Sequence, residues 1–501
     1  MQEIKMGSGM QPVGYTQLIS HHGIAAIPPA VTAEVRSVTR KEWIGDTIAV
    51  PAKMAPAPED LLGQVLFAIK HEGINLQVLA QILPKIPEAD IRQAFDASPN
   101  SQYLRKACYL WEFFAGQTIQ RATDHIRQSY IPLFNPEQYI TGDGEKNARW
   151  RIIFNGLGSL DYCVTVRRTD TLQALLDKSL LEKAAEFTDS LPKDILNRTL
   201  AWAYLHETRD SYAIENEAPS EDKASRFVSL LKQAHSSRKL DEEYLVELQN
   251  AVISNPFAQA ASFRTEQNYL SNGLRGALGV TYVPPGPELS RSLMDQLMAL
   301  ANQPAMEVEP LVLASVVSFG FVFVHPFMDG NGRLSRFLFH QVLCQCGALK
   351  NGLVLPVSIV LRQNESDYLS VLQQFSEPSR AYWDVTFFDE NQFQFDFKGH
   401  DALYRYWDGT ACAEFMARAT EQAIEQHLKA ETLFLTRYDE IFRRIDRAYD
   451  VPNADLSRLV MFCLDQNGRV SGHRRKQYRY RVPEEVFDAL ERAYQKVVVD
   501  T

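Results

Sequence analysis

Apolar residues recur every three or four positions along most of this chain, with polar residues between them. From Asp60 to Lys70 the apolar positions follow the spacing of a helix with one buried face. The same spacing is found at 75–83, 88–95, 101–114, 169–190, 193–216, 227–248, 288–302, 332–346 and 411–448. Residues 311–324 are almost entirely apolar, as expected for a helix that is buried on all sides. The pattern predicts a mainly α-helical protein.

Strand-like patterns are few. Two short ones lie near the N-terminus, at 33–39 and 47–51. Between Arg264 and Val283 the chain alternates around the Asn272-Gly273 pair, which is typical of a hairpin turn. Near the C-terminus, a helix at 456–466 precedes two short strands within 468–482 and a last helix at 483–495. That order predicts a winged-helix-like unit.

The length of 501 residues corresponds to about three domains. We expect a helical N-terminal accessory module at 1–145, a helical segment at 146–225, a central core at 226–400, and a helical and winged-helix-like unit at 401–501. Packing is a better interpretation of the N-terminal module than DNA recognition. No region shows an internal repeat.

Composition and charge narrow the classes of function. With 52 Lys and Arg against 62 Asp and Glu, the net charge is −10, which disfavours non-specific nucleic-acid binding. A basic run at 473–481 leaves such binding open, although a solvated β-ribbon is the better interpretation. The longest apolar run ends short of the ~20 residues that span a membrane. Six Cys residues and an N-terminus without a signal pattern predict a cytoplasmic protein.

The stretch from Phe323 to Phe339 carries the candidate chemistry. His325 follows the apolar helix, and the next turn-forming residues run from Asp329 to Gly332. Such a turn exposes successive backbone N–H groups, and the following helix adds the partial positive charge of its N-terminus. The spacing therefore predicts a site that holds an anion.

Side chains in the same stretch extend this prediction. Arg333 and Arg336 lie three apart on one helix face and suit a polyphosphate. Asp329 offers a hard oxygen ligand for Mg²⁺, and His325 can accept a proton near neutral pH. Together these groups have the chemistry for attack of a hydroxyl on a nucleotide phosphate. Taken singly, each has a simpler interpretation, such as a turn or a helix end.

The run HPFMDGNGRLSR, residues 325–336, resembles the signature of the Fic family, HxFx(D/E)GNGRxxR, at every defined position. The resemblance covers about 200–390. It implies a mainly α, Fic-type helical core with a β-hairpin flap. It also implies a protein adenylyltransferase, an enzyme that moves AMP from ATP to a Ser, Thr or Tyr hydroxyl of a target protein.

The resemblance also assigns roles to residues. His325 is the expected base and Asp329 the expected Mg²⁺ ligand. The flap at 264–282 is expected to align the target by strand pairing. The nucleotide contacts that it implies are Gly330, Asn331, Gly332, Arg333, Arg336 and Tyr368.

A second family feature is an inhibitory helix with the pattern (S/T)xxxE(G/N). Ser211, Glu215 and Asn216 fit it, on a predicted helix upstream of the catalytic loop. The resemblance implies that Glu215 pairs with Arg336 and occupies the place of the γ-phosphate, which would keep the resting enzyme weak. The alternative is an ordinary glutamate at a helix end.

Two other functions remain open from the sequence. One is different chemistry at the same site, such as AMP removal or transfer of another nucleotide. The other is a regulator that binds DNA through its terminal modules and uses the site as a nucleotide sensor. The expected partners are ATP and a protein target that the sequence does not identify. A homo-oligomer is left open, nucleic acid is disfavoured, and no membrane is expected.

Overall fold

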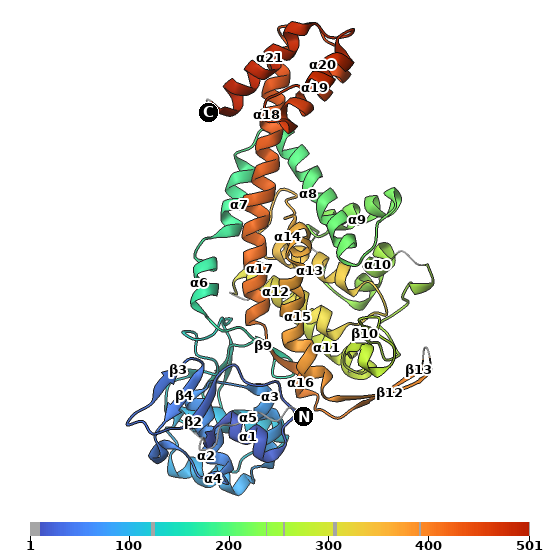
Figure 1. Ribbon diagram of the computed structural model, residues 1–501. Helices are drawn as coiled ribbons and strands as arrows, with labels where there is room; N and C mark the ends of the chain where they lie inside the picture. The colour runs from blue at the N-terminus through green and yellow to red at the C-terminus, as the bar shows by residue number, and fades with distance from the viewer. Residues whose placement is uncertain are drawn as a thin grey trace.

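The computed structural model describes residues 11–121, 126–236, 238–253, 256–303, 308–389 and 392–499. The chain is mainly helical, as predicted, with a helical core between an N-terminal module and a C-terminal helical unit (Figure 1). Within the described residues, none of the helices combines the length and the apolar character that a bilayer crossing requires.

The N-terminal module contains a sheet as well as helices. The strands β1 (Gln11–Val13), β2 (Thr32–Val35), β4 (Thr47–Val50) and β3 (Glu42–Ile44) lie in that order, and the β2–β4 pair is parallel. The strand-like segments expected at 33–39 and 47–51 overlap β2 and β4, so the module that was expected to be helical also contains a sheet, whose apolar residues form a small core of their own with Phe67. The helices are α1 (Tyr15–His22), α2 (Leu61–His71), α3 (Leu76–Ile82), α4 (Glu88–Ala97) and α5 (Gln102–Ala115).

Two small sheets connect this module to the core. One comprises β5 (Ile131–Pro132), β7 (Ile152–Phe154) and β6 (Glu145–Asn147). The other comprises β14 (Tyr406–Asp408), β9 (Cys163–Thr165) and β8 (Leu157–Gly158). Because β9 and β14 pair in parallel, chain segments that are far apart in sequence meet there.

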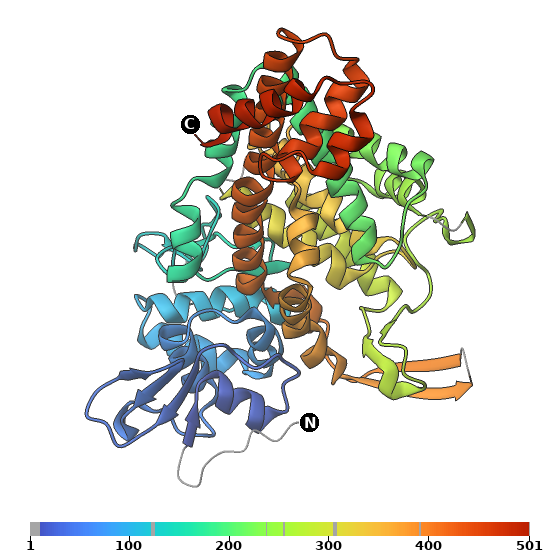
Figure 2. The same cartoon turned by 45° about the horizontal axis from the view of Figure 1, so that its top comes forward.

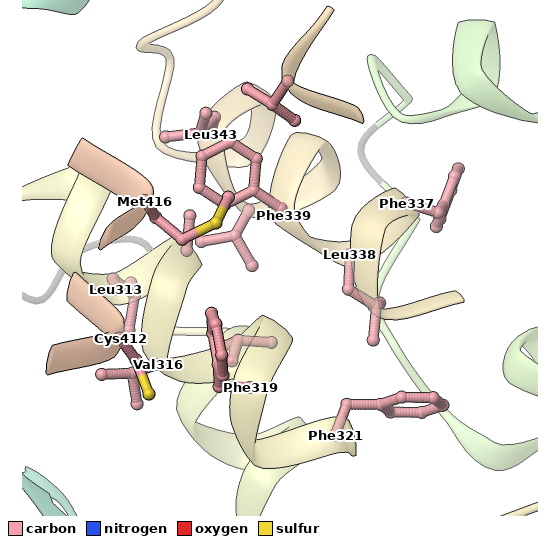
Figure 3. Close-up of a cluster of buried hydrophobic side chains, with 14 of the residues drawn as sticks. Leu313, Val316, Phe319, Phe321, Phe337, Leu338, Phe339, Leu343, Cys412 and Met416 are labelled. Carbon is pink, nitrogen blue, oxygen red and sulfur yellow. The ribbon is translucent and has the colours of Figure 1, made fainter. Parts of the chain in front are cut away.

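The core is built on α12 (Pro310–Val324), which is buried along nearly its whole length. Its neighbours are α13 (Asn331–Gln345) and α17 (Thr410–Gln422), whose side chains interleave with it around Phe319, Phe339 and Met416 (Figure 3). The other core helices are α6 (Asp170–Leu176), α7 (Leu180–Asp189), α8 (Lys193–Ile214), α9 (Glu221–Gln233), α10 (Glu242–Val252), α11 (Pro287–Ala301), α14 (Val357–Gln363), α15 (Glu365–Arg380) and α16 (Ala402–Arg405). The main core extends to Leu428, past the boundary placed at residue 400.

The hairpin predicted between Arg264 and Val283 is present. It consists of β10 (Leu270–Ser271) and β11 (Val280–Tyr282), which pair antiparallel. A second antiparallel hairpin, β12 (Trp383–Asp389) and β13 (Gln392–Phe397), projects from the core beside it (Figure 2). Tyr269, next to β10, packs on Phe393 and Phe395 of β13, so the two hairpins share an aromatic contact.

The C-terminal unit differs from the prediction. After α18 (Lys429–Asp446) come α19 (Asn453–Asp465), α20 (Gly472–Tyr478) and α21 (Glu484–Tyr494). The two strands expected within 468–482 are wrong, because the Ser471 side chain caps α20 and Arg475 forms ion pairs with carboxylates of the following helix. The basic run at 473–481 is therefore largely helical, and its Arg475 is already engaged.

Candidate active site

The loop between α12 and α13 is shaped by its own side chains. His325 ends α12 with a φ of 52°, and Gly330 begins α13 with a φ of 88°. The buried Asn331 side chain accepts a hydrogen bond from the Phe327 N–H at 3.0 Å and donates one to the Phe327 carbonyl at 2.8 Å. Both polar ends of Asn331 thus brace the loop, and any contact of Asn331 with an anion is left to its backbone.

His325 is buried and held in place. Its Nδ1 lies 3.2 Å from the Val322 carbonyl, so a proton on Nδ1 leaves Nε2 as the free acceptor. Burial lowers the pKa of His325 to about 4, and the carbonyl of Val322 opposes that shift only in part. The imidazole is therefore neutral at physiological pH and able to take a proton.

The start of α13 offers an anion site. The first N–H groups of a helix have no partner within the helix, and here they follow the left-handed turn at Gly330. Asp329 lies beside them with its side chain 46% exposed and accepts hydrogen bonds from the Gly330 N–H and from Arg333. An exposed carboxylate beside an anion site fits a Mg²⁺ ion that is shared with phosphate oxygens. Within the described residues no group of three or more metal-ligating side chains gathers.

Arg333 is almost completely buried, with 1% of its side chain exposed. It pairs with Glu217 at 3.0 Å, donates to the Val252 carbonyl at 3.1 Å, and lies over the ring of Tyr212. Its guanidinium therefore fastens α13 to α8 and α10 in this structure.

Arg336 lies one helical turn further along and faces the end of α8. Its Nε donates to Ser211 Oγ at 2.8 Å, and one terminal nitrogen donates both to the Ser211 carbonyl and to Glu215 Oε1, each at 2.8 Å. Ser211 is fully buried. The predicted partners Ser211, Glu215 and Arg336 are thus brought together.

Glu215 follows the last residue of α8, and Asn216 adopts a φ of 57°, a left-handed conformation that Asn tolerates well. The carboxylate of Glu215 lies directly over Gly332, where a Cβ atom would collide with it. Burial raises the pKa of Glu215, but Arg336, with smaller contributions from Arg333 and His325, outweighs burial and holds it below its ordinary value. An ionised carboxylate therefore lies at the first turn of α13.

Tyr368 is packed among aromatic side chains of the core. Its ring stacks on Phe415 and meets Phe319 edge-on. Burial raises the pKa of its hydroxyl, and the nearby Arg336 opposes this. The side chain is next to Arg336, but it forms part of the core in this structure.

Sequence reasoning missed two residues that bind the flap to the catalytic loop. Arg264 is buried, and it donates to the carbonyls of His325, Glu266 and Pro285. Asn268 donates to the carbonyls of Phe327 and Met328, each at 3.2 Å. Neither residue belongs to a local sequence pattern. Its role becomes visible only in the folded chain, where the flap meets the catalytic loop. Glu217, directly after the recognised pattern, was missed for the same reason.

Comparison with known proteins finds similar sequences and structures. The Fic/DOC family model matches residues 239–343. The protein adenylyltransferase Fic of Nematostella vectensis is 24% identical over 311 residues, which is 55% of this chain and 61% of that protein. The protein adenylyltransferase fic-1 of Caenorhabditis briggsae is 30% identical over 136 residues, 26% of this chain and 25% of that protein. The chain thus spans less than two thirds of these curated relatives.

Two solved structures are also similar. A Fic domain containing signaling protein from Bacteroides thetaiotaomicron has a TM-score of 0.37 at 18% identity, with 52% of this chain and 97% of that chain covered. Fic-1 from Caenorhabditis elegans, residues 134–508, has a TM-score of 0.31 at 14% identity, with 74% and 94% covered.

Proposed function

We propose that this chain, whose residues 239–343 match the Fic/DOC family model, transfers AMP from ATP to a Ser, Thr or Tyr hydroxyl of a protein target, with Mg²⁺, and that Glu215 restrains the reaction. One observation carries the proposal. The carboxylate of Glu215 occupies the point where the amide end of α13 and Arg336 converge, 2.8 Å from the guanidinium. A place that holds a carboxylate against an arginine, beside the N-terminus of a helix, also suits a phosphate group.

His325 is the base in this mechanism. Its free Nε2 takes the proton of the target hydroxyl as the oxygen attacks the α-phosphorus of ATP. A phosphorus–oxygen bond to the target forms, the bond between the α-phosphorus and the bridging oxygen breaks, and pyrophosphate leaves. Asp329 would hold Mg²⁺, which when bound neutralises phosphate charge and assists the departure of pyrophosphate.

The first turn of α13 supplies the other contacts. The backbone of Gly330, Asn331 and Gly332 receives phosphate oxygens, and the absence of a Cβ at Gly332 leaves room for them. In the proposal Arg333 contacts the phosphates and Arg336 the γ-phosphate. Tyr368 lies at the adenine end, which requires its ring to move from the packing seen here.

Restraint by Glu215 follows from charge and space. A triphosphate in the productive pose would bring its γ-phosphate against an ionised carboxylate, which is repulsive. The Arg336 nitrogen that contacts Glu215 already donates to two acceptors, so it has no hydrogen left for a phosphate. The productive pose therefore requires the carboxylate of Glu215 to move away, and the resting enzyme is weak.

The flap at 264–282 is the proposed docking site for the target. It is a very short hairpin with apolar side chains in solvent, including Leu274 at 64% and Leu278 at 90% exposure. The outer edge of such a hairpin can pair with an extended segment, which would bring a hydroxyl toward the catalytic loop. The hydrogen bonds of Arg264 and Asn268 hold the flap beside the catalytic loop.

The proposal is tested with Glu215→Gly, in which the carboxylate is lost. The purified variant is incubated with Mg²⁺ and ATP labelled at the α-phosphate, and intact-mass spectrometry looks for added AMP. We expect self-modification to rise by about tenfold or more, which corresponds to the release of a restraint of about 1.4 kcal/mol.

The controls separate this outcome from others. Glu221→Gly removes an exposed carboxylate at the start of α9 and is expected to behave as the parent protein does. Label from the γ-phosphate, or transfer from UTP, GTP or CTP in preference to ATP, would indicate a different nucleotide chemistry. If Glu215→Gly binds ATP yet transfers no more AMP than the parent protein, the proposed restraint is wrong.

A further inference from the structure

The contact between Glu215 and Arg336 is one step of a longer contact between α8 and α13. Residues four apart along α8 and its end meet residues four apart along α13, and the two helices run in opposite directions. In order along α8, the pairs are Glu207 with His340, Ser211 with Arg336, and Glu215 with Gly332. Positions four apart share one face of a helix, so the three pairs form a single seam. The first pair lies outside both the inhibitory pattern and the catalytic loop.

Glu207 is buried at the inner end of this seam, with 1% of its side chain exposed. Its Oε2 accepts a hydrogen bond from the Ser358 N–H at 2.8 Å, and its Oε1 accepts one from the Ser358 hydroxyl at 2.6 Å. Ser358 is the second residue of α14, where helix N–H groups have no partner within the helix. Glu207 therefore supplies a capping acceptor to α14 from a neighbouring helix.

The same carboxyl group reaches α13. Glu207 Oε1 lies 3.2 Å from Nε2 of His340, whose side chain is completely buried. Neither ring nitrogen of His340 makes an aligned hydrogen bond among the described residues, so the imidazole depends on this contact. A buried polar group without a partner costs free energy, and loss of the carboxyl would therefore be felt on both sides. Glu207 thus joins α8 to α13 and to α14, which lie beside it (Figure 1).

The position of Glu215 depends on how α8 is held. Glu215 follows the last residue of α8 and its side chain is 35% exposed, so its place is set largely by the helix before it. It lies eight residues after Glu207, which is about 12 Å along a helix. Over that length a tilt of about 5° moves the end of the helix by about 1 Å. A shift of that size away from Arg336 would lengthen their 2.8 Å hydrogen bond past the usual limit of about 3.2 Å.

We propose that Glu207 is a positioning residue for the restraint at the nucleotide site. By fixing α8 to α13 and α14, it keeps Ser211 and Glu215 against Arg336 without touching nucleotide or target itself. The inference rests on the proposed function, since it names what holds the restraining carboxylate in place. It follows that a tilt of α8 at Glu207 relieves the restraint even when Glu215 is intact.

A purely structural role for Glu207 makes the opposite prediction. If Glu207 only stabilised the core, its loss would weaken the active site whether or not Glu215 is present, and AMP transfer would fall in both cases. If Glu207 acts through Glu215, its loss raises transfer while Glu215 is present and adds nothing once that carboxylate is gone. Non-additive effects of the two substitutions therefore separate the two roles.

The test combines Glu207→Gln with Glu215→Gly in the full chain. Gln keeps the size of the side chain but can accept only one of the two hydrogen bonds from Ser358. With Mg²⁺ and ATP labelled at the α-phosphate, we expect Glu207→Gln alone to raise self-modification by at least about threefold, because it shifts α8 toward the tilted state. In the background of Glu215→Gly we expect no further rise.

Hydrogen–deuterium exchange without nucleotide gives a second readout that does not depend on AMP transfer. We expect Glu207→Gln to speed the exchange of the amides of residues 211–216 by at least about fivefold, because local opening of the end of α8 becomes easier. The amides of α12 should exchange as they do in the parent protein. Faster exchange in both regions would indicate a general loss of stability, as a purely structural role predicts.

Asp210→Asn is the matched control, because Asp210 is also on α8 but pairs with Arg362 of α14 at 2.7 Å rather than with a residue of α13. Arg362 is 58% exposed, so loss of this pair should change both readouts little. Glu207→Asp is used if Glu207→Gln does not fold. Its carboxyl is one CH₂ group shorter and cannot reach α13 and α14 together, so it should produce smaller changes in the same direction.

The outcomes keep this proposal apart from the proposed function. If Glu215→Gly transfers no AMP, the proposed function fails, and the exchange of residues 211–216 alone decides whether Glu207 positions the end of α8. If Glu215→Gly does transfer AMP, the inference is overturned when Glu207→Gln stays at the parental level or changes transfer equally in both backgrounds. In either case it is overturned when exchange at 211–216 stays parental, when α12 exchanges faster to the same extent, or when Asp210→Asn has the same effect.

Discussion

Arg264 and His325 are 61 residues apart in sequence, yet the Arg264 Nε donates a hydrogen bond to the His325 carbonyl at 2.8 Å. The backbone N–H of Arg264 also donates to the Pro326 carbonyl at 2.8 Å. The base of the flap is thus fixed directly to the residue proposed as the catalytic base. In the proposed mechanism, this contact would set the spacing between the docked target and the base.

Arg264→Ala tests how much the contact contributes. It would leave buried carbonyls without donors, so we expect a loss of about 3 kcal/mol in the free energy of unfolding. Urea denaturation followed by circular dichroism measures this loss. Arg40→Ala, which removes an arginine with an 86% exposed side chain, is the matched control and should change stability little. Equal stability of the two variants would contradict the role given to Arg264.

His325 is tested with two substitutions that separate chemistry from backbone conformation. In the background of Glu215→Gly, both His325→Ala and His325→Asn should lower AMP transfer by at least about a hundredfold, because both lose the base. Asn tolerates the φ of 52° better than Ala, so His325→Asn should be the more stable of the two. Labelled transfer and thermal unfolding are the two measurements. Transfer that survives in either variant would exclude His325 as the base.

The low pKa of His325 predicts a pH profile. With a pKa of about 4, the imidazole is already free of its proton at pH 6, so transfer by Glu215→Gly should not fall between pH 8 and pH 6 as it would for an ordinary histidine. Initial rates over this range check the prediction. A midpoint near the ordinary histidine value of about 6.5 would show that the base is not buried as described.

The same shift affects stability. The unfolded chain binds the proton at a higher pH than the folded chain, so the contribution of His325 is complete above about pH 6.5 and is lost as the pH falls toward 4. The lost contribution is roughly 3 kcal/mol at most, from about 1.4 kcal/mol per pKa unit. His325→Asn should lose correspondingly less stability than the parent between pH 7.5 and pH 5, measured by urea denaturation.

Substitutions of Glu217 and Glu215 should have different effects on AMP transfer, although both glutamates pair with an arginine of α13. Glu217→Gln weakens the pairing of the buried Arg333 and should destabilise the fold by about 1 kcal/mol, a modest value because Glu217 is partly exposed. It leaves Arg336 with Ser211 and Glu215, so self-modification should stay near the parental level. A strong rise in transfer, like that expected for Glu215→Gly, would show that Arg333 is restrained as well.

Local signals explain what was predictable. The helices of the core follow from the spacing of apolar residues, because a helix buries one face or all of them regardless of its partners. The flap follows from Asn272-Gly273, and the catalytic loop from consecutive turn residues before a helix. The C-terminal strands were mispredicted because alternating Tyr and Arg resembles a strand, whereas α20 is stabilised by Arg475 and the three carboxylates of Glu484, Asp488 and Glu491.

The sequence by itself determined the mainly helical architecture and the chemical inventory of residues 325–336, since both depend on neighbours in the chain. Only the tertiary structure decided which distant groups meet that inventory: Arg264 and Asn268 from the flap, and Ser211 and Glu215 from the end of α8. Contacts of this kind arise where helices cross and modules join. Their energies depend on burial and distance, which no local pattern encodes.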